Sequence, residues 1–313
     1  MRSAKYSGAG AASEVISIID IEAPVPGHGE VLVKVGAAGL NPVDVKIRAA
    51  ATDFGQIIYT DLPGWDVAGV VAAVGSGVDA WAVGDRVFAL AAFPDAAHTL
   101  AEYAVVAAED LATAPSTWST AQAGAAPLTA LTAWQALEAA GVVAGQRVLV
   151  LGGAGGVGHL AIQLAAARGA EVVATGSPAK NELLRSWGAG QTVDYRDDQA
   201  LAAIAPVDAV VITVDDTLPP RGSVKAGTAV VTITGLSDDH AAQLASWGAG
   251  PIRRILVAAS GAQLAEIAAL AEAGRVSVHL DSEFPLDDLA AAQERVESGR
   301  VTGKVAVIVD PTV

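Results

Sequence analysis

The sequence predicts an α/β fold in which a β-rich domain accompanies a doubly wound parallel sheet. The chain has 313 residues, of which 52% are hydrophobic, so it can build two domains with separate apolar cores. Residues 1–120 contain many short stretches of β-forming residues separated by Gly-rich turns, which is typical of a barrel-like fold. From about residue 122, apolar strand patterns alternate with helical patterns, which indicates a parallel sheet covered on both faces.

Each strand of the first region is predicted from a local pattern. Residues 31–35 alternate in hydrophobicity after the turn residues at 26–29. Residues 67–74 form a β-branched run that the Gly-Ser-Gly sequence at 75–77 closes. Residues 83–88 predict a turn followed by a strand, and residues 103–106 predict a further short strand.

The second region predicts six strands with helices between them. The strands are expected at 147–151, 171–175, 192–194, 208–214, 227–234 and 252–258, and the helices at 123–139, 157–167 and 178–187. Pro178 suits the first turn of the last of these helices. Six strands joined by helices indicate a Rossmann-type domain.

The tail of the chain does not continue this alternation of strands and helices. It predicts an amphipathic helix at 261–273, a strand at 276–280, a helix at 286–298 and a strand at 305–309. We expect this tail to return to the first domain. The predicted domains are therefore 1–122, the first part of the β-rich domain, 123–259, the Rossmann-type domain, and 260–313, the return to the β-rich domain.

Composition excludes several kinds of protein. The chain has no cysteine, which removes disulfides, iron–sulfur clusters and thiolate zinc sites. The formal net charge of -15 argues against nucleic acid or an anionic membrane as a partner. No apolar run reaches the roughly 18 residues that a membrane span needs. We see no signal peptide at the N-terminus, so we expect a cytoplasmic protein.

A glycine-rich turn carries the strongest functional signal. Gly153, Gly155 and Gly158 form a GxGxxG pattern directly after the predicted strand 147–151, and Gly156 and Val157 complete the turn into a helix. We expect the first glycine to make the tight turn, the second to admit a pyrophosphate, and the third to let helix and strand pack closely. The helix N-terminus then attracts the phosphates. The competing interpretation is a Gly-rich turn without a ligand.

The next strand predicts which dinucleotide is bound. An NAD-dependent enzyme places an acidic residue at its end, whereas this chain has Thr175, Ser177 and Lys180 there. Two hydroxyl groups and a positive charge suit a 2′-phosphate, so we expect NADPH. Tyr195, directly after the strand 192–194, completes the predicted cofactor-binding set. An ordinary turn followed by a solvated lysine remains the alternative.

At this point the chain resembles the zinc-free quinone oxidoreductase (zeta-crystallin-like) family of the medium-chain dehydrogenases/reductases. Segments in the family's order run nearly end to end: GLNPVD at 39–44, PGWDVAGVV at 63–71, VGDRV at 83–87, AEYA at 101–104, PLTALTA at 127–133, the glycine turn, FPL at 284–286 and GRVTGKV at 299–305. The resemblance implies a GroES-like catalytic domain around an inserted Rossmann domain, with the active site in the cleft between them.

The resemblance also implies roles for single residues. Asn41 is expected beside the nicotinamide ribose and the substrate carbonyl, and Thr129 near the nicotinamide, so both also count as cofactor-binding residues. Lys46 is the nearest strong donor in sequence, although a solvated surface lysine is the alternative. An aromatic acid or base is not identifiable, because Val45, Lys46 and Ile47 stand where many relatives carry a tyrosine or tryptophan. Tyr59, Trp65, Phe93 and His98 are candidates for pocket walls, and packing is the competing role for each.

The zinc ligands of related enzymes are missing from the matching positions. The first segment has no cysteine, and Trp65 stands where the zinc-dependent relatives have histidine. We therefore expect Asp66 to make structural hydrogen bonds and the reaction to need no metal.

Without a metal, hydride transfer from NADPH to a quinone or an α,β-unsaturated carbonyl compound is the predicted reaction. Two alternatives stay open: an enoyl-thioester reductase, to which Arg221, Arg253 and Arg254 could contribute, and a non-catalytic NADPH-binding protein. The apolar strand 252–258 would be an unprotected edge in a monomer, so we expect a homodimer, as in relatives.

Overall fold

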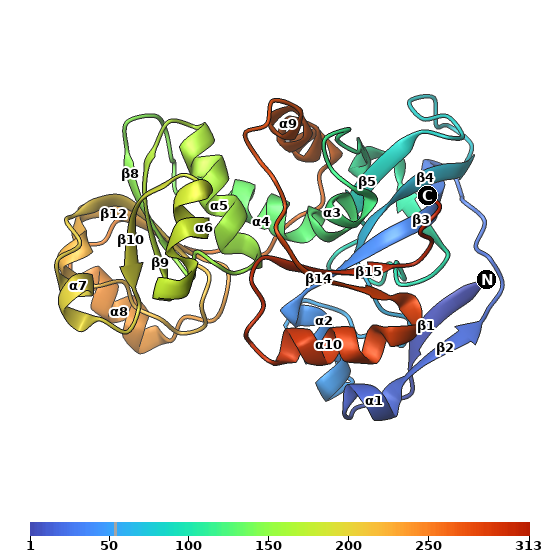
Figure 1. The fold of residues 1–313 in the computed structure, drawn as a ribbon, viewed down its shortest axis with the longest axis horizontal. Helices are drawn as coiled ribbons and strands as arrows, with labels where there is room; N and C mark the ends of the chain where they lie inside the picture. Colours follow the sequence, from blue (N-terminus) through green and yellow to red (C-terminus); the bar gives the residue numbers. More distant parts are fainter. Residues whose placement is uncertain (53–54) are drawn as a thin grey trace. The chain divides into compact units, whose positions relative to one another are not determined.

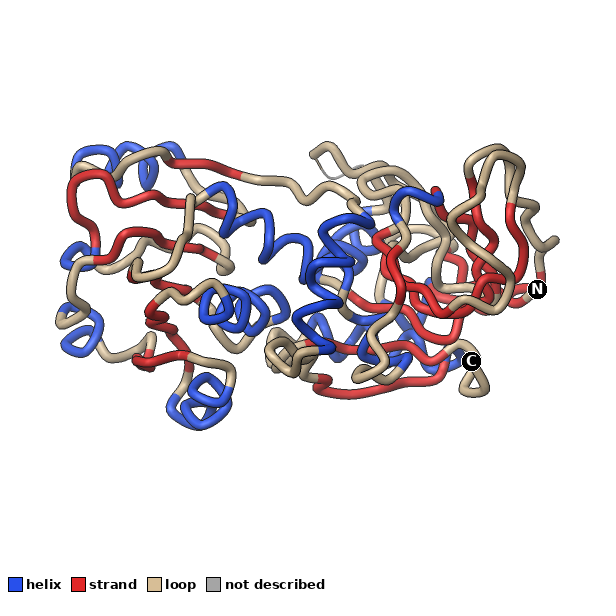
Figure 2. The backbone as a smooth tube through the Cα atoms, turned by 90° about the horizontal axis from the view of Figure 1, so that it is seen from above, coloured by secondary structure: helices blue, strands red, loops and turns tan. Residues whose placement is uncertain are grey.

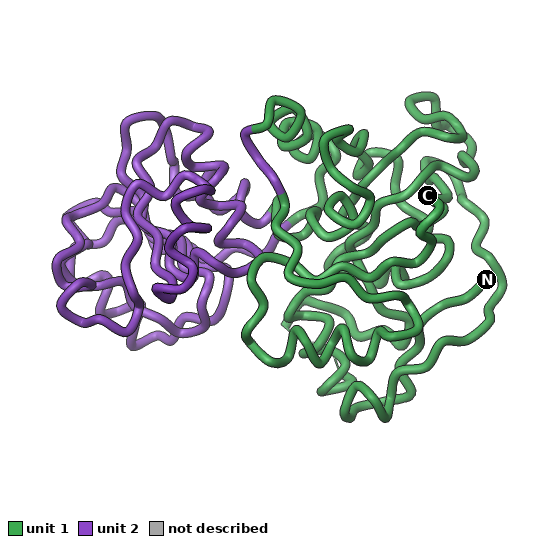
Figure 3. The backbone as a smooth tube through the Cα atoms, viewed as in Figure 1, with its two compact units in different colours: residues 1–131, 258–274, 278–313 green, residues 132–257, 275–277 purple. Residues whose placement is uncertain are grey.

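The computed structural model describes residues 1–52 and 55–313, which divide into two compact units (Figure 3). Unit 1 contains residues 1–131, 258–274 and 278–313, and unit 2 contains residues 132–257 and 275–277. The tail therefore returns to the N-terminal unit. The division falls inside helix α4 (Pro127–Ala139), later than the position at 122 and 123 that the sequence suggested.

Unit 1 is built on a seven-stranded sheet in the order β14-β15-β3-β4-β5-β7, with β6 paired to β3 as well. The strands are β3 (Glu30–Leu40), β4 (Asp66–Val74), β5 (Arg86–Leu90), β6 (Tyr103–Ala107), β7 (Ala112–Thr113), β14 (Leu280–Pro285) and β15 (Lys304–Ile308). The antiparallel register of β15 on β3 pairs Val305 with Leu40. Because of this pairing, the start of a strand from the tail lies at the end of a strand from the first domain.

Smaller elements surround this sheet. The hairpin of β1 (Arg2–Tyr6) and β2 (Ile16–Asp20) encloses the short α1 (Ala12–Val15). Helix α2 (Pro42–Ala50) follows β3, and α10 (Leu289–Glu297) packs against both α2 and β15 (Figure 1). Helices α3 (Thr120–Ala125) and α9 (Gly261–Glu272) complete the unit.

Two glycines let helix α3 approach strand β3 very closely. A Cβ on Gly39 would lie 2.6 Å from Asp66 Oδ2 and 2.9 Å from the Cα of Ala125. A Cβ on Gly124 would lie 2.5 Å from the carbonyl oxygen of Ala37. Since no side chain fits at either place, helix backbone and strand backbone touch, and the chain that follows α3 is held next to the start of β4.

Unit 2 is a six-stranded parallel sheet in the order β10-β9-β8-β11-β12-β13. Its strands are β8 (Arg147–Leu151), β9 (Glu171–Gly176), β10 (Ala189–Asp194), β11 (Val207–Ile212), β12 (Val224–Thr232) and β13 (Ile252–Arg254). Helices α5 (Gly156–Ala167), α6 (Asn181–Ser186), α7 (Asp198–Ala202) and α8 (Asp238–Ser246) come between these strands along the chain. Figure 2 shows the helices of the protein in blue and the strands in red. The order is that of a doubly wound Rossmann sheet, in which successive strands are added on one side of β8 and, from β11 on, on its other side.

Several predicted elements differ from the structure. The predicted helix 123–139 is divided at Pro127 into α3 and α4, because proline lacks the N–H that an unbroken helix needs. The predicted strand 276–280 is wrong except at Leu280, where β14 begins. The Gln163 side chain instead bonds both the N–H and the carbonyl of Ser277, at 2.8 and 2.9 Å. The strand predicted at 252–258 is shorter and ends at Arg254.

Across residues 1–52 and 55–313, every helix is too short or too polar to cross a bilayer.

Candidate functional site

Asp66 joins the two segments that the sequence singled out for catalysis. It is the first residue of β4 and is fully buried. Its Oδ2 accepts a hydrogen bond of 2.8 Å from the side-chain nitrogen of Asn41, and its Oδ1 accepts one of 2.6 Å from the backbone N–H of Leu128. The predicted structural role of Asp66 is confirmed. One carboxylate therefore holds the end of β3 and the start of the helix that carries Thr129.

Asn41 is placed by its own helix. It precedes α2 in an extended conformation, and its backbone N–H donates to Asp44 Oδ2 at 2.8 Å. The N–H of Asp44 donates in return to the Asn41 carbonyl at 3.0 Å. Pro42 suits the first helical position because the N–H that it lacks would have no partner there. These contacts fix the Asn41 backbone at the start of α2.

The third member of the cluster is Lys304, the first residue of β15. Its ammonium group donates to the carbonyl oxygen of Leu40 at 2.9 Å and to the side-chain oxygen of Asn41, and it lies 3.6 Å from Asp66 Oδ2. Only 2% of the side chain is exposed. Sequence reasoning quoted the segment 299–305 but missed this residue. The available signal was a lysine that opens an otherwise apolar strand.

The cluster places two carboxylates and one ammonium group out of contact with water. Burial raises the pKa of Asp66 and lowers that of Lys304, and the attraction between the two opposes both shifts. Burial also raises the pKa of Asp44 to about 7, against the hydrogen bond from the Asn41 backbone. Asp44 Oδ1 is buried and has no hydrogen-bond partner among the described residues. The site therefore holds one more acidic group than its lysine can balance.

Thr129 and Lys46, both predicted to be catalytic, lie in different surroundings: Thr129 is buried and Lys46 is exposed. The Thr129 hydroxyl donates to the carbonyl oxygen of Ala126 at 3.1 Å. Thr129 directly follows Leu128, whose backbone N–H donates to Asp66. Lys46 lies on the exposed side of α2, whereas Asp44, Ile47 and Arg48 form its buried side. The fold therefore brings Asn41 and the Thr129 segment together but leaves Lys46 outside the buried cluster.

A second buried network holds helix α2 in place. The fully buried guanidinium group of Arg48 donates to Gln293 Oε1 at 2.7 Å and pairs with Glu297. Gln293 in turn donates to the hydroxyl of Tyr6 at 2.5 Å. Figure 1 shows α10, which carries both partners, running beside α2. The network ties the helix that begins after Asn41 to the tail and to the N-terminal hairpin.

The glycine turn of unit 2 follows β8 as the sequence predicted, but the glycine that makes the tight turn is a different one. The left-handed backbone falls on Gly152, with φ at 79°, and not on Gly153, which packs beside Ala174 and Ile162. A Cβ on Gly158 would lie 2.1 Å from the Gly152 carbonyl oxygen, so the predicted close packing there is confirmed. A Cβ on Gly155 would meet only that oxygen, at 3.5 Å, so this side of the turn has open space.

The residues predicted to bind the 2′-phosphate lie in two places, one behind the glycine turn and one at the end of β9. Thr175 is 3% exposed, and its hydroxyl accepts the N–H of Gly152 at 3.1 Å, so it supports the glycine turn from behind. Ser177 and Lys180 are half-buried at the end of β9, and Tyr195 is 57% exposed at the end of the neighbouring β10. Sequence reasoning missed Arg196, whose guanidinium group lies 5.3 Å from the Tyr195 ring and donates two hydrogen bonds to Asp194.

The candidate wall residues are largely packing residues. Trp65 is buried edge-on against Phe93 at 5.4 Å, and its indole donates to the Asp95 carbonyl at 2.6 Å. His98 has a left-handed backbone, with φ at 58°, and its ring lies 3.2 Å from the Thr60 hydroxyl. Tyr59 is half-buried.

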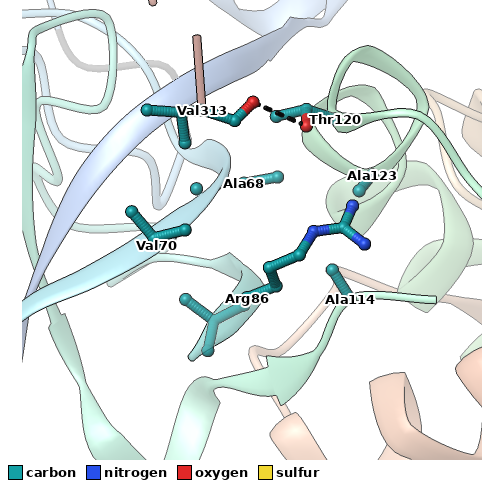
Figure 4. A pocket seen from close by; sticks show the side chains of 9 residues that line it. Ala68, Val70, Arg86, Ala114, Thr120, Ala123 and Val313 are labelled. Carbon is teal, nitrogen blue, oxygen red and sulfur yellow. Dashed lines mark hydrogen bonds between the residues drawn. The ribbon is translucent and has the colours of Figure 1, made fainter. Parts of the chain in front are cut away.

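Unit 1 also has a small pocket of about 10 Å³, room for about one water molecule. Figure 4 shows the Arg86 side chain reaching along it toward Ala123, and the Thr120 hydroxyl bonded to Val313. Its lining residues include none of those predicted for catalysis.

A GroES-like unit that contains an inserted Rossmann unit defines a medium-chain dehydrogenase/reductase. Residues 27–116 match the family model described as alcohol dehydrogenase GroES-like domain, and residues 187–307 match the one described as zinc-binding dehydrogenase. The sequence is 35% identical to 2-methylene-furan-3-one reductase of Solanum lycopersicum and 34% identical to the chloroplastic NADPH-dependent alkenal/one oxidoreductase of Arabidopsis thaliana. Each alignment covers 98% of this chain and 79% of the relative.

A solved structure extends the same comparison. The quinone oxidoreductase of Coxiella burnetii superposes with a TM-score of 0.87 at 30% identity, over 99% of each chain. The chain therefore belongs to the quinone oxidoreductase (zeta-crystallin-like) family of the medium-chain dehydrogenases/reductases.

Proposed function

We propose that this protein is an NADPH-dependent reductase that transfers hydride to a quinone or an α,β-unsaturated carbonyl compound. The observation that carries the proposal is the glycine turn at the end of β8, where the sheet order reverses and where α/β proteins bind nucleotides. The relatives named for alkenal and quinone reduction support the substrate class. The thioester alternative loses support because Arg221 stacks on Trp247 and Arg253 donates to the Ala139 carbonyl.

The residues of unit 2 fit the phosphorylated dinucleotide. The open space at Gly155 admits a pyrophosphate, and the N-terminus of α5 offers backbone N–H groups to it. Ser177 and Lys180 supply a hydroxyl group and a positive charge for the 2′-phosphate, and Tyr195 offers an exposed ring beside them. Arg196 adds a second positive charge next to that ring.

NADPH, when bound, would supply the hydride for the electron-poor carbon of the substrate, and water would supply the proton that completes the reduction. Asn41 and the segment of Thr129 are the residues of unit 1 proposed to serve this step. The amide nitrogen of Asn41 carries two hydrogens, of which Asp66 takes one. The other can be donated to a ligand oxygen.

We propose that no metal takes part. The residues at the matching position do not suit zinc, because the indole of Trp65 is bonded to Asp95 and both oxygens of Asp66 accept hydrogen bonds. The ammonium group of Lys304 already provides a positive charge beside that carboxylate. Among residues 1–52 and 55–313, no three His, Asp or Glu side chains gather as a metal site would require.

We propose a homodimer formed through β13, the last strand of the parallel sheet. Its outer edge has no partner strand among the described residues, and the nearby Leu256 is 44% exposed. Light scattering at micromolar concentration is expected to give twice the mass of the chain, and a monomeric mass would rule the dimer out.

The function is tested by following NADPH absorbance with 1,4-benzoquinone, an alkyl enone and crotonyl-CoA, each with and without EDTA. We expect turnover of the quinone or the enone, unchanged by the chelator. Preference for crotonyl-CoA would favour the thioester reductase. Tight NADPH binding with no turnover of any acceptor would favour a binding protein, and loss of activity in EDTA would contradict the metal-free mechanism.

A further inference from the structure

We propose that Lys304 is a positioning residue that holds the side-chain amide of Asn41 in one orientation, with its oxygen toward the ammonium group and its nitrogen toward Asp66. The kinetic consequence of this proposal rests on the proposed function. The orientation itself does not, so it can be tested in the protein without any substrate.

The chemistry of the three groups permits only this orientation. An ammonium group can only donate hydrogen bonds and an ionised carboxylate can only accept them. In the structure the Asn41 oxygen accepts from Lys304, and its nitrogen donates to Asp66 at 2.8 Å. A flipped Asn41 amide would place its NH₂ group against the ammonium group of Lys304 and its oxygen against the carboxylate of Asp66. Both hydrogen bonds would become repulsive contacts inside a buried site.

Without Lys304, this preference would be weakened. Asp66 would still attract the amide nitrogen, but the amide oxygen would lose its charged donor. The Leu40 carbonyl, which accepts from the same ammonium group at 2.9 Å, would also lose its donor. The ammonium group of Lys304 thus binds both Leu40, the last residue of β3, and Asn41, the residue after it.

The backbone around Lys304 is built to deliver the side chain to this point. Because Val305 pairs with Leu40, the antiparallel register places Lys304 opposite Asn41. The Lys304 N–H donates to His279 at 2.9 Å. Gly303 has a φ of 68°, and a Cβ there would lie 2.1 Å from the same His279 carbonyl oxygen. Only glycine therefore lets the chain enter β15 in this way.

Charge neutralisation of Asp66 is the simpler role that the experiment must separate from positioning. The two roles differ in the double variant Asp66→Asn/Lys304→Met, which removes both charges together. If neutralisation is the only role, this variant behaves like Asp66→Asn. If Lys304 positions the amide, the double variant regains stability over Lys304→Met but keeps a disordered Asn41 side chain.

The first measurement uses the small number of asparagines. Asn41 and Asn181 are the two asparagines of the wild-type chain, so protein labelled with ¹⁵N only at asparagine gives two side-chain amide pairs, which Asn181→Ala assigns. Variants that carry Asp66→Asn show a third pair, which ¹⁵N–¹H contacts to the neighbouring Leu128 N–H assign to position 66. We expect the Asn41 pair to shift or broaden in Lys304→Met, and in the double variant relative to Asp66→Asn. An Asn41 pair unchanged by loss of the lysine in both backgrounds would overturn the proposal.

The second measurement is kinetic. We expect kcat of the double variant to fall about tenfold or more below that of Asp66→Asn, with a much smaller change in the KM for NADPH, as for loss of a charged hydrogen bond. Equal kcat values in these two variants would leave neutralisation as the only role. Lys34→Met is the matched control, because Lys34 also lies on the β3 sheet and pairs with Asp310 at 2.7 Å, away from Asn41. It is expected to keep wild-type kcat.

The two proposals fail in different ways. If the wild-type protein reduces no acceptor while the Asn41 amide responds to Lys304, the proposed function is wrong and the positioning role stands. If Lys304→Met does not fold, the comparison of Asp66→Asn with the double variant still decides the matter.

Discussion

Lys304 and Asn41 are 263 residues apart in the chain, yet the ammonium group of one donates a hydrogen bond to the side-chain oxygen of the other inside the fold. Asp66 and Leu128 extend this contact to the starts of β4 and α4. One buried cluster therefore fixes four segments relative to one another. Residues that share such a network are not energetically independent, so single substitutions within it are expected to have non-additive effects.

The glycine turn offers a matched pair of substitutions. Gly158→Ala is expected to destabilise the protein by about 3 kcal/mol or more, because its Cβ would overlap the Gly152 carbonyl oxygen and the backbone would have to move. Gly155→Ala is expected to change stability by no more than about 1 kcal/mol, since its Cβ has room. It should nevertheless weaken NADPH binding, because the methyl group occupies the space proposed for the pyrophosphate. Thermal unfolding and fluorescence titration with NADPH measure the two effects.

Undiminished NADPH affinity in a well-folded Gly155→Ala protein would contradict the proposed place of the pyrophosphate.

We propose that the residues at the end of β9 determine the preference between NADPH and NADH. Lys180→Ala is expected to weaken NADPH binding by about 1–3 kcal/mol and to leave NADH binding nearly unchanged, because only NADPH carries the 2′-phosphate. Thr175→Val serves as the comparison. The hydroxyl that it removes supports the turn at Gly152, so we expect this variant to weaken the binding of both cofactors equally. Titrations of both variants with both cofactors give the ratio, and an equal loss for NADH and NADPH in Lys180→Ala would refute the assignment.

Asp44 should make stability depend on pH. Its pKa is raised from 3.8 to about 7 in the folded protein, so between these values the folded state holds a proton that the unfolded state has released. Raising the pH through this window therefore favours unfolding, and the penalty is constant above it. Asp44→Asn has no such group and can still accept the N–H of Asn41. We expect the Tm of the wild type to fall relative to that of Asp44→Asn between pH 4 and pH 7.

Thermal unfolding of both proteins across this range is the measurement. Parallel Tm profiles would show that Asp44 titrates as an ordinary carboxyl group.

The local features of this protein follow from its sequence. The alternation of apolar strands and helices predicted the parallel sheet, and Gly153, Gly155 and Gly158 after a buried strand predicted the turn that opens α5. These features depend on neighbours in the chain, where hydrophobic period and backbone freedom act directly. Even there, the left-handed residue proved to be Gly152, because GGAGG at 152–156 offers four glycines and the local pattern does not choose among them.

Sequence reasoning identified only part of the buried cluster around Asp66. Asn41 and Thr129 were identified through the resemblance, but the donor chosen for them was Lys46, the nearest in sequence, which lies on the exposed side of α2. The buried donor is Lys304, which reaches Asn41 because β15 pairs with β3. Helical period and strand pattern determine which residues share an element. Only the pairing of distant strands, and the close approach of α3 that Gly39 and Gly124 permit, decided which charges meet in the core.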